Sequence, residues 1–399
     1  MTIESLDKAF VLSSYGRNYT SFVEGKGAKL YDDKGKEYID FASGIGVSSV
    51  GHGNEILVSA ICSQAQRLIH TSNLQVIEPQ AKLAEQIVGL SGYDMRCFFG
   101  NSGAEANEAA IKIARKHGKV SFDNGKFDKK RYKVITLEHS FHGRTITTVR
   151  ATGQDSFHSP NFSPYPEGFS YVSTIDDVYG HVDDETVAVL IELVQGEGGV
   201  QPFEKAEIQK LARDMKSRGI LLMVDEVQTG IYRTGEFLAS NLYDIEPDVI
   251  TLAKGLAGGI PIGVAMTNLK DIFEPGDHGS TFGGNYISTS AGLAVLEVLG
   301  GEKDSGALDE RIELFRENLE RIVTNYPKLF SQSVGIGLML GLRARDSKIQ
   351  QSVVAAAFDE GLIVLKAGRD TVRFLPPLTI TKKEIIEGFS RFEKVISAI

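Results

Sequence analysis

Cysteine and tryptophan are scarce in this chain of 399 residues: Cys62 and Cys97 are its two cysteines, and it has no tryptophan. Two cysteines cannot build the disulfide framework that small secreted domains use in place of a large core, so that class of protein is excluded. The simpler expectation is a protein of a reducing compartment.

An excess of basic charge is also lacking, because 43 lysines and arginines face 52 acidic residues, for a net charge of -9. Nucleic acid and anionic membrane surfaces do not attract a net anion, so we expect neither as a partner. The first residues, which include Glu4 and Asp7, show neither the basic segment of an export signal nor a long apolar run. We therefore expect a cytoplasmic protein.

The apolar residues are sufficient for two domains, since they make up 42% of a chain too long for one core. Short apolar runs alternate with stretches of helical spacing, which is typical of an α/β fold with a parallel sheet. The runs that predict buried strands are Met95–Phe99, Val134–Leu137, Val187–Val194, Leu221–Val224 and Val249–Ala253.

Two of these strands end on chemically active side chains. The run at 221–224 stops at Asp225, and the run at 249–253 stops at Lys254. Ligands of open parallel sheets bind outside the carboxyl ends of the strands, so both side chains can face one small molecule. A lysine that forms a Schiff base and an aspartate that pairs with a pyridine nitrogen suit pyridoxal phosphate. On these two positions alone, a helix cap and a solvated lysine are the commoner interpretation.

Other motifs are weaker. The turn Gly100–Ala104 joins a strand to a helix and favours an anion site, whereas a hydrolase nucleophile elbow would need glycine at Ala104. His139 and His142 lack a third ligand at a fixed spacing, so we expect a structural role and no metal. Gly335–Gly337 comes nearest to a dinucleotide-binding loop of an oxidoreductase, but its spacing to Gly341 is one residue too long.

The two ends of the chain have their own patterns. Lys29 to Phe41 predicts a hairpin, and Thr381 with Glu384 predicts the capping box of a final helix. Ile61, Ala65, Leu68 and Ile69 fit one face of a helix. We expect a large domain over residues 56–299 and a small domain formed by residues 1–55 and 300–399.

Seven segments in order carry a family resemblance: FFGNSGAEANEAA (98–110), SFHGRT (140–145), QGEGG (195–199), DEVQTG (225–230), LAKG (252–255), GDHGSTFGGN (276–285) and RFLPP (373–377). With them the chain resembles the class III pyridoxal-phosphate-dependent aminotransferases of fold type I over nearly its whole length. The resemblance implies a large domain with a mostly parallel central sheet, a smaller α+β domain, and pyridoxal 5'-phosphate as cofactor.

The resemblance also implies catalytic and cofactor-binding residues. Lys254 would form the Schiff base and shuttle the proton, Asp225 would pair with the pyridine nitrogen, and Gln228 would hydrogen-bond the ring oxygen. Phe141 would stack on the ring. Those that would meet the phosphate are Ser102, Gly103 and Ala104, joined by Thr281 from a neighbouring subunit. A homodimer with active sites at the subunit interface follows from that sharing.

Substrates would be held by arginines. Arg144 and Arg373 can each grip a carboxylate bidentately, and glutamate, the usual amino partner of this family, has two. Glu197 would pair with Arg373 as a gate, and Ser280 would lie beside the substrate. The chain departs from the commonest family pattern at Ala104, which replaces a hydroxyl residue of the phosphate loop, but no catalytic group is lost.

The resemblance is strongest to the enzymes that move the terminal amine of N2-acetylornithine to 2-oxoglutarate in arginine biosynthesis. Ile45 stands where ornithine aminotransferases tend to carry tyrosine, which weakens that alternative. Succinyldiaminopimelate, ornithine and 4-aminobutyrate stay open as other amino substrates of the same class. A non-enzymatic relative that merely binds the cofactor is disfavoured by the intact Lys254.

Overall fold

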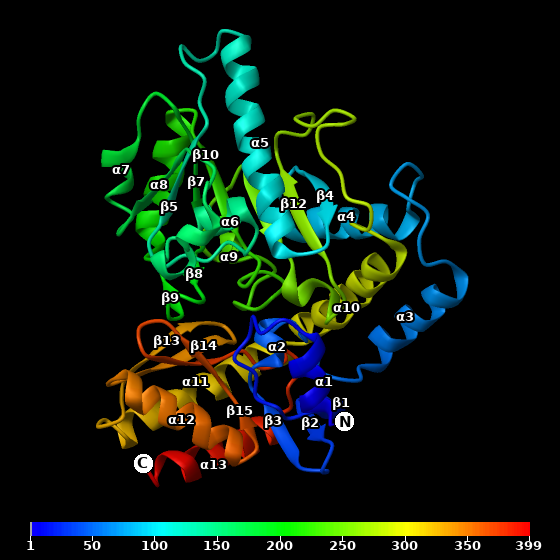
Figure 1. The fold of residues 1–399 in the computed structure, drawn as a ribbon, viewed down its shortest axis with the longest axis vertical. Coiled ribbons are helices and arrows are strands. Elements are labelled where there is room, and N and C mark those ends of the chain that lie inside the picture. Colours follow the sequence, from blue (N-terminus) through cyan, green and yellow to red (C-terminus); the bar gives the residue numbers. More distant parts are fainter. Residues whose placement is uncertain (1) are drawn as a thin grey trace.

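The computed structural model describes residues 2–399. Figure 1 shows an upper part built around one large sheet and a lower part that contains both chain ends. None of the helices in residues 2–399 is both long enough and apolar enough to cross a membrane.

The large sheet has seven strands in the order β4-β12-β11-β10-β7-β5-β6. β12 runs antiparallel to β11 and β4, and the remaining pairs are parallel. The α/β fold with a mostly parallel sheet is therefore confirmed. The strand bounds are β4 Arg96–Gly100, β5 Lys133–Leu137, β6 Phe169–Val172, β7 Thr186–Ile191, β10 Leu221–Asp225, β11 Val249–Leu252 and β12 Gly263–Thr267.

Helices cover both faces of this sheet, which explains why its central strands are continuous apolar runs. Leu221 and Met223 of β10 pack in one apolar cluster with Ala110 of helix α5 (Gly103–Asp123). Leu222 and Val224 point the opposite way and share a cluster with Leu211 of α8 (Lys205–Ser217). The smaller elements around the sheet are α4 Glu78–Ser91, α6 Ile146–Ala151, η1 Asp155–Phe157, η2 Pro160–Phe162, α7 Val178–His181, β8 Val194–Gln195, β9 Gln201–Pro202, α9 Ala239–Leu242 and η3 Lys254–Ala257.

The strand register brings the two reactive strand ends together. Asp225 of β10 lies opposite Thr251 of β11. β11 ends at Leu252, and the short helix η3 begins at Lys254. Asp225 and Lys254 therefore lie at the same edge of the sheet.

Two four-stranded sheets form the lower part, ordered β1-β2-β3-β15 and β13-β14-β17-β16. The predicted hairpin is confirmed as the antiparallel pair of β2 and β3, and β15 adds to β3 in parallel, with Leu362 opposite Ile39. The capping box of Thr381 and Glu384 is also confirmed. The elements here are α1 Ile3–Phe10, β1 Phe22–Lys26, β2 Lys29–Asp32, β3 Glu37–Asp40, α2 Ser43–Gly46, α11 Ala307–Asn325, β13 Phe330–Ile336, β14 Met339–Ala344, α12 Ser347–Asp359, β15 Leu362–Ile363, β16 Leu365–Ala367, β17 Thr371–Phe374 and α13 Lys382–Ile396.

The domain boundaries at 55/56 and 299/300 stay a prediction. Helix α10 spans Tyr286–Asp304, so the second boundary falls within a continuous helix. The first falls at the start of helix α3, which spans Glu55–Arg67.

The predicted helix face of Ile61, Ala65, Leu68 and Ile69 is wrong at its C-terminal end, because α3 ends at Arg67. Ile61 is only half-buried, Ala65 is exposed, and Leu68 and Ile69, just beyond the helix, are 40% and 58% exposed. Figure 1 shows α3 at the margin of the chain. Apolar spacing indicates that a face is made for burial, and it does not indicate which partner buries it.

The segment Gly335–Gly337 is not the dinucleotide-binding loop that the oxidoreductase alternative requires. Gly335 lies within strand β13, and Gly337 has a φ of 63° in the turn to β14. These two strands form an antiparallel hairpin, whereas a dinucleotide-binding loop joins a strand to a helix.

Candidate active site

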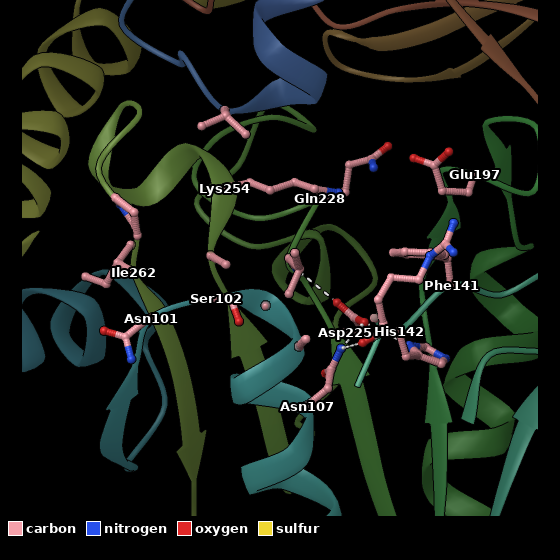
Figure 2. Close-up of a pocket in the computed structure, with 18 of the residues that line it drawn as sticks. Asn101, Ser102, Asn107, Phe141, His142, Glu197, Asp225, Gln228, Lys254 and Ile262 are labelled. Carbon is pink, nitrogen blue, oxygen red and sulfur yellow. Dashed lines mark hydrogen bonds and ion pairs between the residues drawn. The ribbon is translucent and has the colours of Figure 1, made fainter. Parts of the chain in front are cut away.

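A cavity of about 450 Å³ lies at the carboxyl ends of β10 and β11. Nine of the predicted site residues line it, and Figure 2 shows most of them around one space. They are Ser102, Gly103, Ala104, Phe141, Arg144, Glu197, Asp225, Gln228 and Lys254. Arg373, Ser280 and Thr281 are not among the residues lining the cavity.

Asp225 is held by a hydrogen-bond network at the bottom of the cavity. Its Oδ2 lies 2.8 Å from His142 Nδ1 and accepts a hydrogen bond of 2.8 Å from Asn107 Nδ2, while Oδ1 accepts one of 3.0 Å from Val227 N. Burial raises the pKa of Asp225, but the bonds from His142, Val227 and Asn107 outweigh it and hold this pKa below its usual value. The carboxylate therefore stays ionised in a buried place.

Asn107 was missed by sequence reasoning. It is buried on α5, donates a second hydrogen bond of 2.8 Å to His142 O and accepts one of 2.8 Å from Thr251 Oγ1. It lies four residues before Ile111 and therefore on the inward face of the helix. A polar residue on a buried face needs partners, and that signal was present in the sequence.

The purely structural interpretation of His142 was incomplete, because its ring lines the cavity beside Asp225. The side chain is buried, and its Nε2 has no hydrogen-bond partner within residues 2–399. The sequence gives no indication that His142 and Asp225 meet, since 83 residues separate them.

Lys254 extends along the cavity from the start of η3 (Figure 2). Burial lowers the pKa of its amine, and nearby Arg373 lowers it further, against the opposing influence of Glu197 and Asp225. A lowered pKa increases the fraction of neutral amine, which is the nucleophilic form.

The turn before α5 is shaped for an anion. Ser102 caps the helix by accepting a hydrogen bond of 3.2 Å from Glu105 N. A Cβ at Gly103 would lie 2.7 Å from Val227 Cγ1, so the turn packs too closely against Val227 for a residue with a side chain. Free N–H groups and the helix dipole favour a phosphate at this end.

Arg373 lies behind Glu197. The two form a bidentate ion pair with distances of 2.7 Å (Nη1 to Oε1) and 3.3 Å (Nη2 to Oε2), and Nη1 also donates a hydrogen bond of 3.4 Å to Gln228 Oε1. Burial raises the pKa of Glu197, but Arg373 more than compensates and keeps this pKa below its usual value. Arg373 comes from β17, so the pair joins the lower sheet to the cavity.

Arg144 is the exposed cation at the cavity. Its guanidinium carbon lies 3.9 Å from the centre of the Phe157 ring and 5.7 Å from that of Phe141. In the described part of the chain, no carboxylate lies within ion-pair distance of Arg144. It is therefore available to an external carboxylate.

Ser280 and Thr281 lie in a loop outside the cavity. Ser280 Oγ accepts hydrogen bonds of 3.0 Å from Asn101 Nδ2 and 2.9 Å from Gly283 N, and Thr281 is exposed. Within one subunit these two residues do not join the other predicted site residues, and their supply by a neighbouring subunit stays a prediction.

Comparisons with known proteins agree with this geometry. The family model described as Aminotransferase class-III matches residues 13–396. The chain is 60% identical to a protein of Wolinella succinogenes named acetylornithine aminotransferase, over 99% of this chain and 100% of that protein.

Solved structures are similar as well. The N-acetylornithine aminotransferase of Stenotrophomonas maltophilia has a TM-score of 0.82 and 32% identity, covering 99% of this chain and 98% of that one. An ornithine aminotransferase of Toxoplasma gondii, described with partial occupancy of PLP at its active site, has a TM-score of 0.92 and 31% identity, covering 100% and 95%. The chain therefore belongs to the class-III aminotransferase family and is an aminotransferase of fold type I.

Proposed function

We propose that this aminotransferase binds pyridoxal 5'-phosphate and moves the terminal amine of N2-acetylornithine to 2-oxoglutarate, giving acetylglutamate semialdehyde and glutamate. The observation that carries the proposal is the convergence of Lys254 and Asp225 in one cavity beside the N-terminus of α5. The 60% identical relative supports the choice of substrate. A cytoplasmic enzyme of arginine biosynthesis that acts as a homodimer is part of the proposal.

The residues around the cavity fit the cofactor. His142, whose buried Nε2 has no partner in residues 2–399, makes one end of the cavity polar together with Asp225. Phe141 offers an aromatic wall, and the glycine at 103 lets the turn before α5 pack closely against Val227. Lys254, Asp225 and the turn Ser102–Ala104 would hold the aldehyde, the pyridine nitrogen and the phosphate. When bound, the group supplies an electron sink for the carbon that loses a proton.

The chain's own residues supply binding and proton transfer. Lys254 provides the nucleophilic amine and moves the proton between the two carbons that exchange hydrogen. Asp225 stays anionic because Asn107 and His142 fix its carboxylate. Gln228 would hydrogen-bond the ring oxygen.

Two substrates of different charge share the site. Acetylornithine has one carboxylate and a neutral amide, so Arg144 suffices for it while Glu197 neutralises Arg373. Glutamate and 2-oxoglutarate have a second carboxylate, which would displace Glu197 and pair with Arg373. This exchange keeps a partner for the buried arginine in both half-reactions.

The test is one assay series on the purified enzyme with 2-oxoglutarate and each of four donors: acetylornithine, succinyldiaminopimelate, ornithine and 4-aminobutyrate. We expect the highest specificity constant with acetylornithine. A higher value for any other donor would overturn the substrate assignment. Lys254→Ala serves as the blank, because it removes the amine.

A further inference from the structure

Glu192 is a buried acid without a cationic partner. It directly follows β7, is 5% exposed and lines the cavity. Its Oε2 accepts a hydrogen bond of 3.0 Å from Phe141 N, and its Oε1 accepts a long one of 3.4 Å from Gly196 N. Across residues 2–399, no lysine, arginine or histidine forms an ion pair with it. Two backbone amides are the partners of this carboxyl group.

The two amides belong to different walls of the cavity. Phe141 is the aromatic wall, and Gly196 begins the Glu197 loop (residues 196–199). A side chain at Gly196 would lie 2.1 Å from Gln228 Oε1, so this loop packs directly on Gln228. Gln228 in turn accepts the hydrogen bond from Arg373. A shift of Gly196 would therefore reach both Gln228 and the Glu197–Arg373 pair.

We propose that Glu192 is a positioning residue whose single carboxylate fixes the aromatic wall and the Glu197 loop relative to each other. This inference rests on the proposed function, since it assumes that the cofactor stacks on Phe141. An ionised Glu192 can accept from both amides, whereas a protonated one carries a hydrogen on one oxygen and loses an acceptor.

The carboxyl group of Glu192 changes its ionisation near neutral pH. Burial raises its pKa to about 7, with His142 lowering it and Asp225 raising it. The other charged group that faces it is Lys254. The hydrogen bonds that Glu192 accepts from Phe141 N and Gly196 N therefore strengthen as the pH rises through neutrality.

The experiment compares three variants of the full-length enzyme. Glu192→Gln removes the charge, and Glu192→Asp keeps it but cannot reach both amides. Glu226→Gln is the matched control: Glu226 is equally buried and also accepts from backbone amides, at Ala239 N (2.8 Å) and Ser240 N (2.7 Å), but it does not line the cavity.

The first measurement is the visible circular dichroism of bound pyridoxal phosphate between about pH 6 and pH 8, which reports the asymmetry of the ring's surroundings. We expect a change near neutrality in the parent and in Glu226→Gln, and no such change in Glu192→Gln. The second is the affinity of the apoprotein for pyridoxal phosphate, which should fall roughly tenfold in both Glu192 variants, the loss expected for a hydrogen bond to a charged group.

Parent-like dichroism and affinity in both Glu192 variants would overturn the inference. A loss of thermal stability alone, equal to that of Glu226→Gln, would also overturn it, because Glu192 would then be a structural acid. If Glu192→Gln fails to fold, Glu192→Asp carries the test. A parent that binds no pyridoxal phosphate would instead refute the proposed function, so the two failures are distinguishable.

Discussion

Arg373 and Glu197 share two contacts, of 2.7 and 3.3 Å, and Arg373 is only 2% exposed. The arginine is fixed on a strand, whereas Glu197 lies on a loop beside Gly196, Gly198 and Gly199. The acid is therefore the partner that can move away. A buried cation left without its partner costs about 3 to 5 kcal/mol.

Glu197→Ala should therefore shift the preference from acetylornithine to glutamate, since only glutamate brings a carboxylate for Arg373. We expect the ratio of the two half-reaction specificity constants to change by more than about tenfold. Glu204→Ala, on an exposed residue nearby, is the control. An unchanged ratio in Glu197→Ala would mean that the pair is only a structural salt bridge.

Lys254→Ala should abolish the covalent link to the cofactor. The measurement is the mass of the protein after borohydride treatment with pyridoxal phosphate: the parent gains a stable adduct and the variant does not. Lys112→Ala, on an exposed lysine, should behave like the parent. An adduct of parent yield in Lys254→Ala would show that another amine reacts.

Lys254→Met should raise the thermal midpoint of the cofactor-free protein. Burial lowers the pKa of this amine below 10.5, so the unfolded chain binds more protons than the folded one between the two pKa values. The stability of the parent therefore rises with pH in that window, and the advantage of the variant should narrow toward about pH 10. Calorimetry at several pH values checks this. A difference in thermal midpoint between Lys254→Met and the parent that widens with pH would contradict this prediction.

Asn107→Ala should weaken the affinity for pyridoxal phosphate by about ten- to a hundredfold, because Asp225 loses a hydrogen bond that favours its ionised form. Titration of the apoprotein measures this affinity. Asn318→Ala on α11, whose side chain bonds to Leu314 O within its own helix, is the control. Equal affinities for pyridoxal phosphate in the two variants would show that Asn107 does not support cofactor binding.

The active unit should be at least a homodimer. The loop with Thr281 is hydrogen-bonded to Asn73, and the apolar side chains of Leu74 (90% exposed), Val76 (88%) and Phe282 (61%) lie in these two segments. Leu74→Asp should promote dissociation and lower activity, whereas Ile386→Asp, at an apolar site on α13 that is 59% exposed, should not. Sedimentation at assay concentration measures the oligomeric state of the parent and of both variants. A parent that is a fully active monomer would refute the homodimer.

Local patterns predicted much of this molecule. The apolar runs before Asp225 and Lys254 predicted two buried strands, and the general geometry of parallel sheets brought their ends together. The turn Gly100–Ala104 after a predicted strand located the start of helix α5. These predictions succeed because the signal and the structure involve the same few residues.

The sequence was less informative where distant segments meet. The contact of His142 with Asp225 depends on how two strands and a helix pack, and neither residue's neighbours indicate it. Glu192 was overlooked for the same reason, since its partners are backbone amides of other segments. The exposed face near Leu68 shows the remaining limit: periodicity measures an apolar surface and not its partner.

The parallel pairing of β3 with β15 has a consequence for how the chain is made. Ile39 of β3 pairs with Leu362 of β15. The ribosome synthesises β15 more than three hundred residues after β3, so this edge of β3 is unpaired in the meantime. Until then, the N-terminal sheet exposes unpaired backbone, which is a template for wrong pairing. Completion of this sheet is therefore a late event in biogenesis, and we expect nascent chains truncated before β15 to be the aggregation-prone species.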